Sequence, residues 1–108
     1  MCIRDSQETV LQALQNVADV LRALEADAAR LKERTEAEER ARRLREIAAQ
    51  RLSMGGISEA ALIETTRHHR RALLEQTQAL ADRYADSAAL MQALGGGWWN
   101  RADGPERP

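Results

Sequence analysis

The sequence contains no phenylalanine, one tyrosine and two tryptophans, so large aromatic side chains are nearly missing from it. Hydrophobic residues make up 44% of the 108 residues, but many of them are alanines. These side chains are too few and too small to fill a globular core at normal packing density. We therefore expect at most one domain, and one that is not built around a globular core.

Neither charge sign dominates, and no long apolar run is present. Charged residues make up 31% of the chain, yet the net charge is −1, so acidic and basic residues are interleaved. This balance argues against a nucleic-acid partner, which would favour a basic excess. No stretch approaches the roughly 18 apolar residues of a membrane-spanning helix. Abundant Ala, Glu, Leu and Arg with a heptad period is typical of long helices and coiled coils.

The only cysteine, Cys2, lies in an unusual N-terminal segment. Met1-Cys2-Ile3-Arg4-Asp5-Ser6 resembles the translation of a transposon end used in sequencing libraries. We expect residues 1–6 to be a non-native leader, the alternative being a genuine short N-terminus. Cys2 then carries no information about the redox compartment.

Residues 7–52 are predicted to form a first long helix. Their apolar residues alternate spacings of 4 and 3, as in a coiled-coil interface: Val10, Leu14, Val17, Leu21, Leu24, Ala28 and Leu31. The pattern loosens over residues 32–43 and resumes at Leu44, Ile47, Ala48 and Leu52. Acid–base pairs four residues apart fill the gap and predict a solvated helix face: Glu36–Arg40, Glu38–Arg42 and Glu39–Arg43.

Residues 53–57 are the only interior interruption and predict a tip turn. Gly55 or Gly56 can adopt positive φ and cap the first helix. Ser58 can cap the second helix, predicted over residues 58–94, with Glu59 favourably placed at its positive end. The expected interface of this helix comprises Ile63, Thr66, Arg70, Leu73, Thr77, Leu80, Tyr84, Ser87, Met91 and Leu94.

The two stripes predict an antiparallel pair. With the turn centred at the glycines, facing residues should have numbers that sum to about 111. Ala48 then faces Ile63, Leu31 faces Leu80, Ala28 faces Tyr84, Leu24 faces Ser87, Leu21 faces Met91, and Val17 faces Leu94. The predicted fold is all-α, a long antiparallel helical hairpin. Because polar residues dilute both stripes, we expect other helices to complete its core.

The chemistry-bearing residues do not predict an enzyme, a metal site or a cofactor. His68 and His69 are the only histidines, and neighbours on a helix point about 100° apart. We therefore expect Arg67 to Arg71 to form a solvated face. No nucleophile–base set, phosphate loop or carboxylate pair is recognisable.

The end of the second helix carries a resemblance to a known family. Ala93-Leu94-Gly95-Gly96-Gly97-Trp98 resembles the C-terminal signature of TolC-like bacterial outer-membrane efflux proteins. Leu52-Ser53-Met54-Gly55 and Leu62-Ile63-Glu64 resemble the family's tip motif, with Leu52 in place of its tyrosine and Glu64 in place of its aspartate. Residues 95–108 would then hold the Gly-Trp segment and a disordered tail. Trp98 and Trp99 would dock onto the helical wall or a neighbouring subunit, or else contact the membrane interface.

The resemblance implies that the chain is a C-terminal fragment of a trimeric outer-membrane channel in a tripartite pump. Its hairpin would line the periplasmic tunnel, with a descending and then an ascending helix, for passive export of drugs, metal ions or other small solutes. The partners implied are other copies of the parent protein, a periplasmic adaptor and an inner-membrane pump. The tunnel entrance and adaptor contact would comprise Leu52, Ser53, Met54, Gly55, Gly56, Ile57, Ser58 and Glu64.

Two alternatives remain. The first is the hairpin of the periplasmic adaptor itself, which Arg51-Leu52-Ser53 weakly suggests, although an adaptor should continue into β-strands instead of Gly-Gly-Gly-Trp. The second is a coiled-coil interaction module, which would form a stable oligomer by itself. For a tunnel fragment we expect a weakly helical or aggregating chain.

Overall fold

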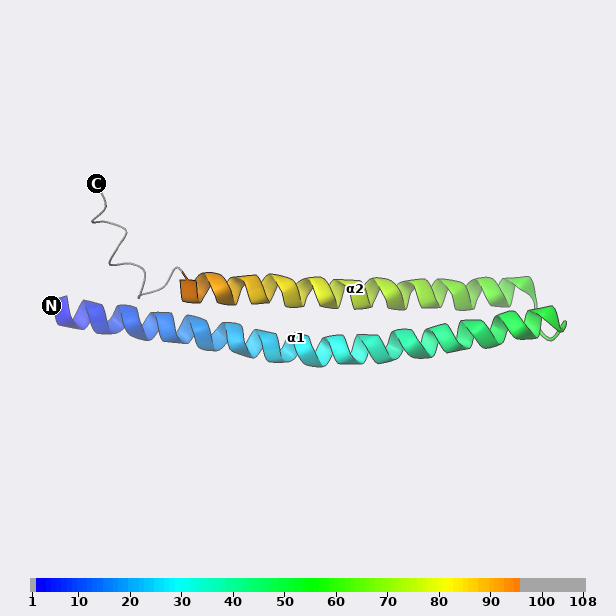
Figure 1. Ribbon diagram of the computed structural model, residues 1–108, viewed down its shortest axis with the longest axis horizontal. Helices are drawn as coiled ribbons and strands as arrows, with labels where there is room; N and C mark the ends of the chain where they lie inside the picture. The colour runs from blue at the N-terminus through cyan, green and yellow to red at the C-terminus, as the bar shows by residue number, and fades with distance from the viewer. Residues whose placement is uncertain (1, 96–108) are drawn as a thin grey trace, which may run out of the picture. The chain divides into compact units, whose positions relative to one another are not determined.

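The computed structural model describes residues 2–95, and they are all-α (Figure 1). Helix α1 spans Cys2–Ser53 and helix α2 spans Glu59–Gly95. The prediction of a helical hairpin is confirmed. Helix α1 ends one residue after the predicted limit, and α2 begins and ends one residue later than predicted. Residues 2–6 of the expected leader belong to α1.

The hairpin divides into two compact units, and each contains a stretch of both helices. Unit 1 comprises Met1–Ala26 with Arg83–Pro108, of which residues 2–26 and 83–95 are described. Unit 2 comprises Asp27–Asp82 and includes the turn. We describe the packing of each unit separately.

Backbone hydrogen bonds stabilise the turn between the two helices in unit 2. The Gly56 N–H donates to the Arg51 carbonyl at 2.7 Å, and the Gly55 N–H donates to the Leu52 carbonyl at 3.0 Å. These two bonds form a Schellman motif, which needs a left-handed residue after the helix. Gly55 supplies it, with φ of 79°. Of the two glycines that the sequence offered as the cap, the structure uses Gly55.

The start of α2 is capped as predicted. The Ala61 N–H donates to the Ser58 hydroxyl oxygen at 3.2 Å, and the Leu62 N–H donates to the Ser58 carbonyl at 3.3 Å. The hydroxyl therefore satisfies one of the free N–H groups in the first helical turn. Glu59 lies in that same turn, where a negative charge interacts favourably with the helix dipole.

Within unit 2 the two helices pair in antiparallel fashion. Side-chain hydrogen bonds join Arg45 to Thr66, Glu38 to His69, Gln76 to Thr35 and Arg34 to Glu75. The residue numbers of these pairs sum to between 107 and 111, close to the value that the sequence predicts. The direction and approximate register of the hairpin are therefore as expected in this unit.

The predicted interface of α2 is displaced by one residue at most of its positions in unit 2, although the predicted residue Thr66 is half-buried and bonds to Arg45 of α1. The residues of unit 2 that pack against α1 alternate at 3 and 4 as Thr65, His69, Ala72, Gln76 and Ala79, with Ala72 and Ala79 buried. The predicted members Ile63, Leu73 and Leu80 are 56%, 40% and 38% exposed. A shift of one residue turns a stripe by about 100° around a helix. Small and polar residues therefore form most of the α2 contact, whereas Ile63, Leu73 and Leu80 lie outside it.

On helix α1, too, small and polar residues are buried where larger apolar residues were expected. Its buried residues are Asp27, Glu38, Ala41 and Ala48, whereas the predicted residues Leu44 and Ile47 are 54% and 44% exposed. Ala48, Leu31 and Leu52 are correct interface predictions, since Ala48 is buried and the other two are half-buried. The expectation of a solvated charged face is wrong at Glu38, because alanine neighbours bring α2 close to it.

Unit 1 packs less tightly. Its half-buried residues include Val17, Val20 and Leu24 on α1 and Leu90 and Ala93 on α2, and none of its described residues is buried. The predicted facing pairs of this unit fail at Leu21 with Met91, which are 47% and 75% exposed. Tyr84, also expected in the interface, is 68% exposed.

Candidate interaction surface

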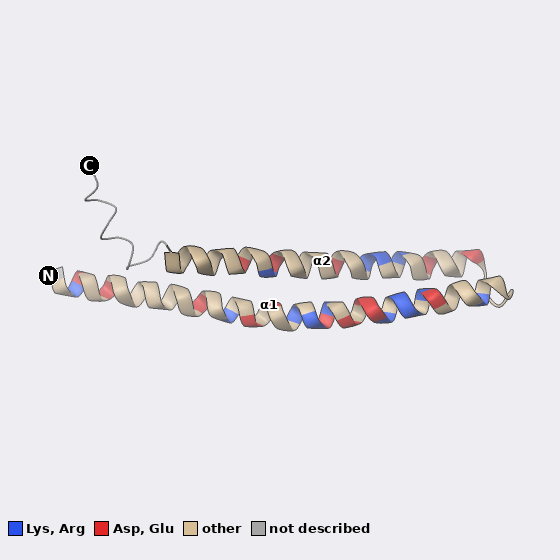
Figure 2. Cartoon of the chain, in the orientation of Figure 1, with Lys and Arg blue, Asp and Glu red and all other residues tan. Residues whose placement is uncertain are grey.

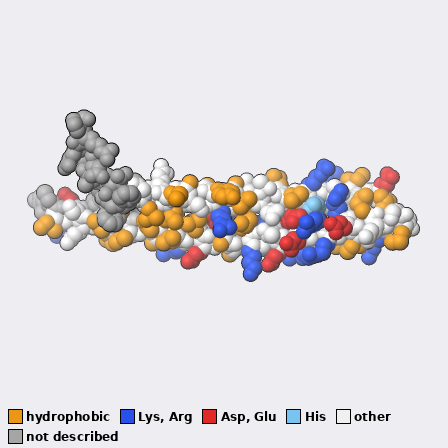
Figure 3. Space-filling view, in the orientation of Figure 1, with side chains coloured by type: hydrophobic (Ala, Val, Ile, Leu, Met, Phe, Trp, Pro, Cys, Tyr) orange, Lys and Arg blue, Asp and Glu red, His pale blue; other side chains and the backbone are white. Residues whose placement is uncertain are grey.

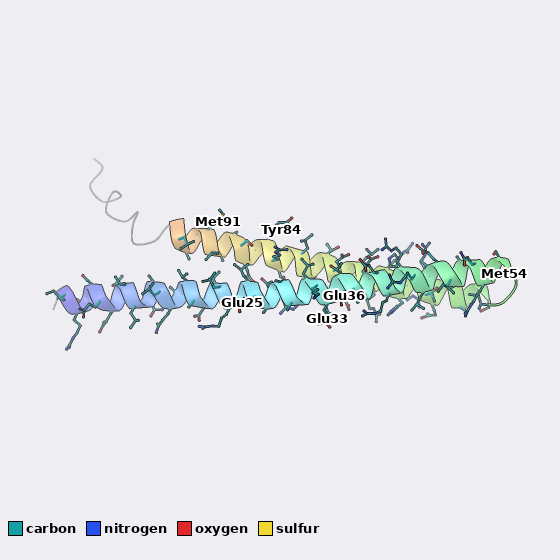
Figure 4. All side chains as sticks on the ribbon, turned by 60° about the horizontal axis from the view of Figure 1, so that its bottom comes forward. Glu25, Glu33, Glu36, Met54, Tyr84 and Met91 are labelled. Atoms are coloured by element: carbon teal, nitrogen blue, oxygen red, sulfur yellow. The ribbon has the colours of Figure 1, made fainter. Side chains whose placement is uncertain are left out.

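The turn brings seven of the eight predicted tip residues together. Leu52 and Ile57 are half-buried, whereas Met54 is 79% exposed at the end of the hairpin (Figure 4). The Ser53 hydroxyl donates to the Gln50 carbonyl at 2.7 Å. The tip therefore presents a small surface made of backbone and one long apolar side chain.

Glu64, the eighth predicted tip residue, lies on α2 beyond the turn. It is exposed, and its carboxylate accepts from the Arg67 guanidinium at 2.8 Å. This local pair belongs to the surface of a single helix. The structure therefore does not bring Glu64 into the turn.

Only the first part of the C-terminal motif is described. Leu94 is 48% exposed, and the half-buried Gly95 is the last residue of α2. Gly96, Gly97, Trp98 and Trp99 lie outside the described residues. The predicted roles of the two tryptophans are taken up below as a proposal.

A polar cluster crosses the interface of unit 2. His69 Nε2 lies 2.8 Å from Glu38 Oε2, and both side chains are nearly buried, with exposed fractions of 13% and 11%. The Arg42 Nε atom lies 3.9 Å from the same oxygen. The expectation that His69 belongs to a solvated face is therefore wrong, whereas His68 is exposed as predicted.

The sequence held a signal for this cluster. Glu38 lies among the interface positions, and the residue number of His69 is close to that required by the antiparallel register. The larger apolar stripe of α2, one position away, masks this signal because hydrophobicity favours it as the interface. When the predicted stripe is shifted by one residue, His69 and Gln76 lie in the interface with α1 and Arg70 lies outside it.

A second carboxylate lies in the contact face without full pairing. Asp27 is 4% exposed, and its Oδ1 atom lies 3.3 Å from Arg30 Nη1. Its Oδ2 atom is buried and has no hydrogen-bond partner. An unsatisfied buried oxygen of this kind is destabilising, by about 1–3 kcal/mol.

The largest unexplained feature is the exposed apolar stripe. In unit 1, Leu14 and Leu21 on α1, and Met91 and Leu94 on α2, each follow a half-buried interface residue by one position. Because the helices are antiparallel, this offset turns both stripes toward the same side of the unit. One side of unit 1 is therefore a broad apolar surface.

Charge is distributed in the opposite way. Charged residues crowd both helices of unit 2, whereas they are sparse in the described parts of unit 1 (Figure 2). The space-filling view shows hydrophobic side chains gathered away from the turn and charged side chains nearer to it (Figure 3). The apolar surface in unit 1 is thus a candidate contact for other helices.

The described residues contain no obvious chemical centre. Among residues 2–95 no three metal-ligating side chains are grouped where they could hold an ion. In the same range, neither helix combines the length and apolar character that a bilayer crossing requires.

Comparisons with known proteins add no identification. No family model, curated protein or solved structure matches the chain.

Proposed function

We propose that the chain is one hairpin of the periplasmic helical tunnel of a TolC-like outer-membrane channel. The observation that carries the proposal is the apolar stripe outside the hairpin's own interface, from Ile63 through Leu73 and Leu80 in unit 2 and through Met91 in unit 1. Large apolar residues at heptad spacing are the signature of helix packing. Since the hairpin does not use them, further helices must cover them.

Two sequence features favour the tunnel over other helical assemblies. Ala93-Leu94-Gly95-Gly96-Gly97-Trp98 resembles the family's C-terminal signature, and Leu52-Ser53-Met54-Gly55 resembles its tip. The parent protein would be a homotrimer that passively exports drugs, metal ions or other small solutes. A periplasmic adaptor and an inner-membrane pump would be its partners.

In this proposal the turn forms the tunnel entrance and meets the adaptor. Met54, exposed at the end of the turn, would contact the adaptor, while Leu52 and Ile57 would supply an apolar constriction. Glu64 belongs to the helix surface above this entrance.

The parent reading frame provides the decisive test. Sequencing the source DNA upstream of the codon for Gln7 should reveal an earlier copy of this hairpin and two pairs of β-strands. A parent frame without that duplicate and those strands would contradict the tunnel assignment.

The same stripe supports a second candidate, a coiled-coil interaction module. Sedimentation of the full chain over a range of concentrations distinguishes the two. A tunnel hairpin taken from its assembly should be weakly helical or aggregate without a fixed stoichiometry. A module should form one defined, fully helical oligomer, and that result would favour the second candidate.

A further inference from the structure

Helix α1 extends past the part of α2 that covers it. In unit 1 the first half-buried residue of α1 is Ala13, and every residue from Ile3 to Gln12 is exposed. On the other helix, the half-buried residues continue to Gly95, the last one described. The interface line of α1 through Val17 and Ala13 therefore continues onto Val10, which is 49% exposed.

An apolar face of α1 lies at this uncovered position. It comprises Val10, Leu11 and Leu14, together with Ile3, Ser6 and Gln7. Leu11 and Leu14 are 57% and 58% exposed. Gln7, Val10, Leu11 and Leu14 lie outside the expected leader, whereas Ile3 and Ser6 belong to it.

The chain that follows α2 has the composition and length to cover this face. It continues as Gly96-Gly97-Trp98-Trp99, and these are the only tryptophans in the sequence. Since α2 is antiparallel to α1, its end is directed toward the N-terminus of α1. Three or four extended residues reach about 10–14 Å, whereas Ala13 to Gln7 spans about 9 Å along a helix.

The glycines make the path sterically accessible. Glycine takes positive φ as readily as negative φ, so Gly96 and Gly97 can leave the helix axis in any direction. Each indole that follows can bury on the order of 150–250 Å² of apolar surface. No other segment of the known sequence places two aromatic residues within this reach.

We infer that Trp98 and Trp99 dock onto Val10, Leu11 and Leu14 of the same chain. This contact would cover the part of unit 1 in which residues 3–12 of α1 are exposed. It does not depend on the tunnel proposal, because it requires only this chain.

Tryptophan fluorescence of the full chain tests the inference, because both reporters lie in the docking segment. We expect the emission to be blue-shifted relative to N-acetyltryptophanamide and protected from acrylamide. Leu14→Gln should reduce the ratio of docked to undocked segments roughly tenfold, since one leucine contact is lost. The emission should then shift to the red, while quenching should increase. Glutamine is a good helix former, so α1 itself should persist.

Leu74→Gln is the matched control, because Leu74 is 70% exposed on α2 in unit 2. It should leave the tryptophan emission unchanged. Equal emission from L14Q and the unmodified chain would overturn the inference, as would fully solvated tryptophans in the unmodified chain. Shielding that increases with protein concentration would place the indoles on a second copy and would also overturn it.

A second measurement, amide hydrogen exchange, monitors the α1 residues that the tryptophans would cover. The double variant Trp98→Ala, Trp99→Ala should accelerate amide hydrogen exchange at residues 7–14 severalfold, because the end of α1 would fray more readily. Exchange at residues 52–58 in the turn should not change. Unaltered exchange at residues 7–14 would show that the indoles do not cover this helix end.

Discussion

The two units of the hairpin contrast in what they bury. Every described residue classed as buried, Ala41, Ala48, Ala72 and Ala79 with Asp27 and Glu38, lies in unit 2, the more charged unit. The large apolar side chains in the described part of unit 1, mostly Val and Leu, are all half-buried or exposed. Close helix approach therefore follows small side chains here, and large apolar side chains mark a different surface. Substitutions on the two kinds of surface should separate these roles.

The largest effect is expected at the most deeply buried residue of α2, Ala79. Ala79 is 2% exposed, so Ala79→Leu would force the helices apart and should lower the free energy of unfolding by about 1–3 kcal/mol. Ala81→Leu, the same change at an exposed position of α2, should have little effect. Urea unfolding followed by circular dichroism measures both. Equal stability of the two variants would contradict alanine-directed packing.

A comparable loss is expected at the polar cluster. Glu38→Ala would leave the His69 ring without its partner and should cost about 1–3 kcal/mol. A double-mutant cycle with His69→Ala should give a coupling energy of about 0.5–3 kcal/mol. The exposed pair Glu64–Arg67 is the control, with an expected coupling of about 0–1 kcal/mol. Coupling no larger than in this control would mean that the cluster adds no net stability.

The turn should show a smaller effect. Gly55→Ala places a Cβ at φ of 79° and should cost about 1–2 kcal/mol, although nothing lies within 4 Å of that atom. Gly56→Ala is the matched change without positive φ, and its Cβ would meet the Arg51 carbonyl at 3.4 Å. It should cost less than Gly55→Ala. The thermal midpoints of the two variants compare them, and the reverse order would contradict the assignment of the cap.

The smallest effect on folding is expected on the exposed stripe of unit 1. Met91 is 75% exposed, so Met91→Gln should change the free energy of unfolding by no more than about 0.5 kcal/mol. Leu90 is half-buried one position earlier, and Leu90→Gln should cost about 1 kcal/mol. Urea unfolding of the two variants therefore tests the one-residue correction to α2. A larger loss from M91Q than from L90Q would restore the frame predicted from the apolar pattern.

Much of the fold followed from the sequence. The 4–3 spacing predicted both helices, Gly55 and Gly56 predicted the turn, and Ser58 predicted the cap. These features are set locally by backbone conformation and hydrogen bonding. They do not depend on which face of α1 packs against which face of α2.

The helix faces could not be predicted in the same way. The pattern of α2 contains two adjacent stripes, one through Leu73 and Leu80 and one through Ala72 and Ala79. Hydrophobicity alone favours the leucine stripe as a contact surface. Close antiparallel packing against α1 favours the alanine stripe. Which of them faces α1 depends on the small residues of the partner helix, Ala41 and Ala48. Residues 52–58 lie together because they are consecutive in the turn, whereas Glu64 lies five residues beyond the first residue of α2, and the role of these residues stays a prediction.

The Schellman turn also determines the order in which the arms of unit 2 can associate. Arg45 and Thr66 are separated by 21 positions along the chain, whereas Arg34 and Glu75 are separated by 41. Each doubling of a loop adds about 0.6 kcal/mol of closure entropy, so contacts beside the glycines form at the lowest entropic cost. Once they exist, every later contact closes only a short additional loop. We therefore expect the arms to associate from the glycines outward, so that the polar and alanine-rich contacts of unit 2 form first.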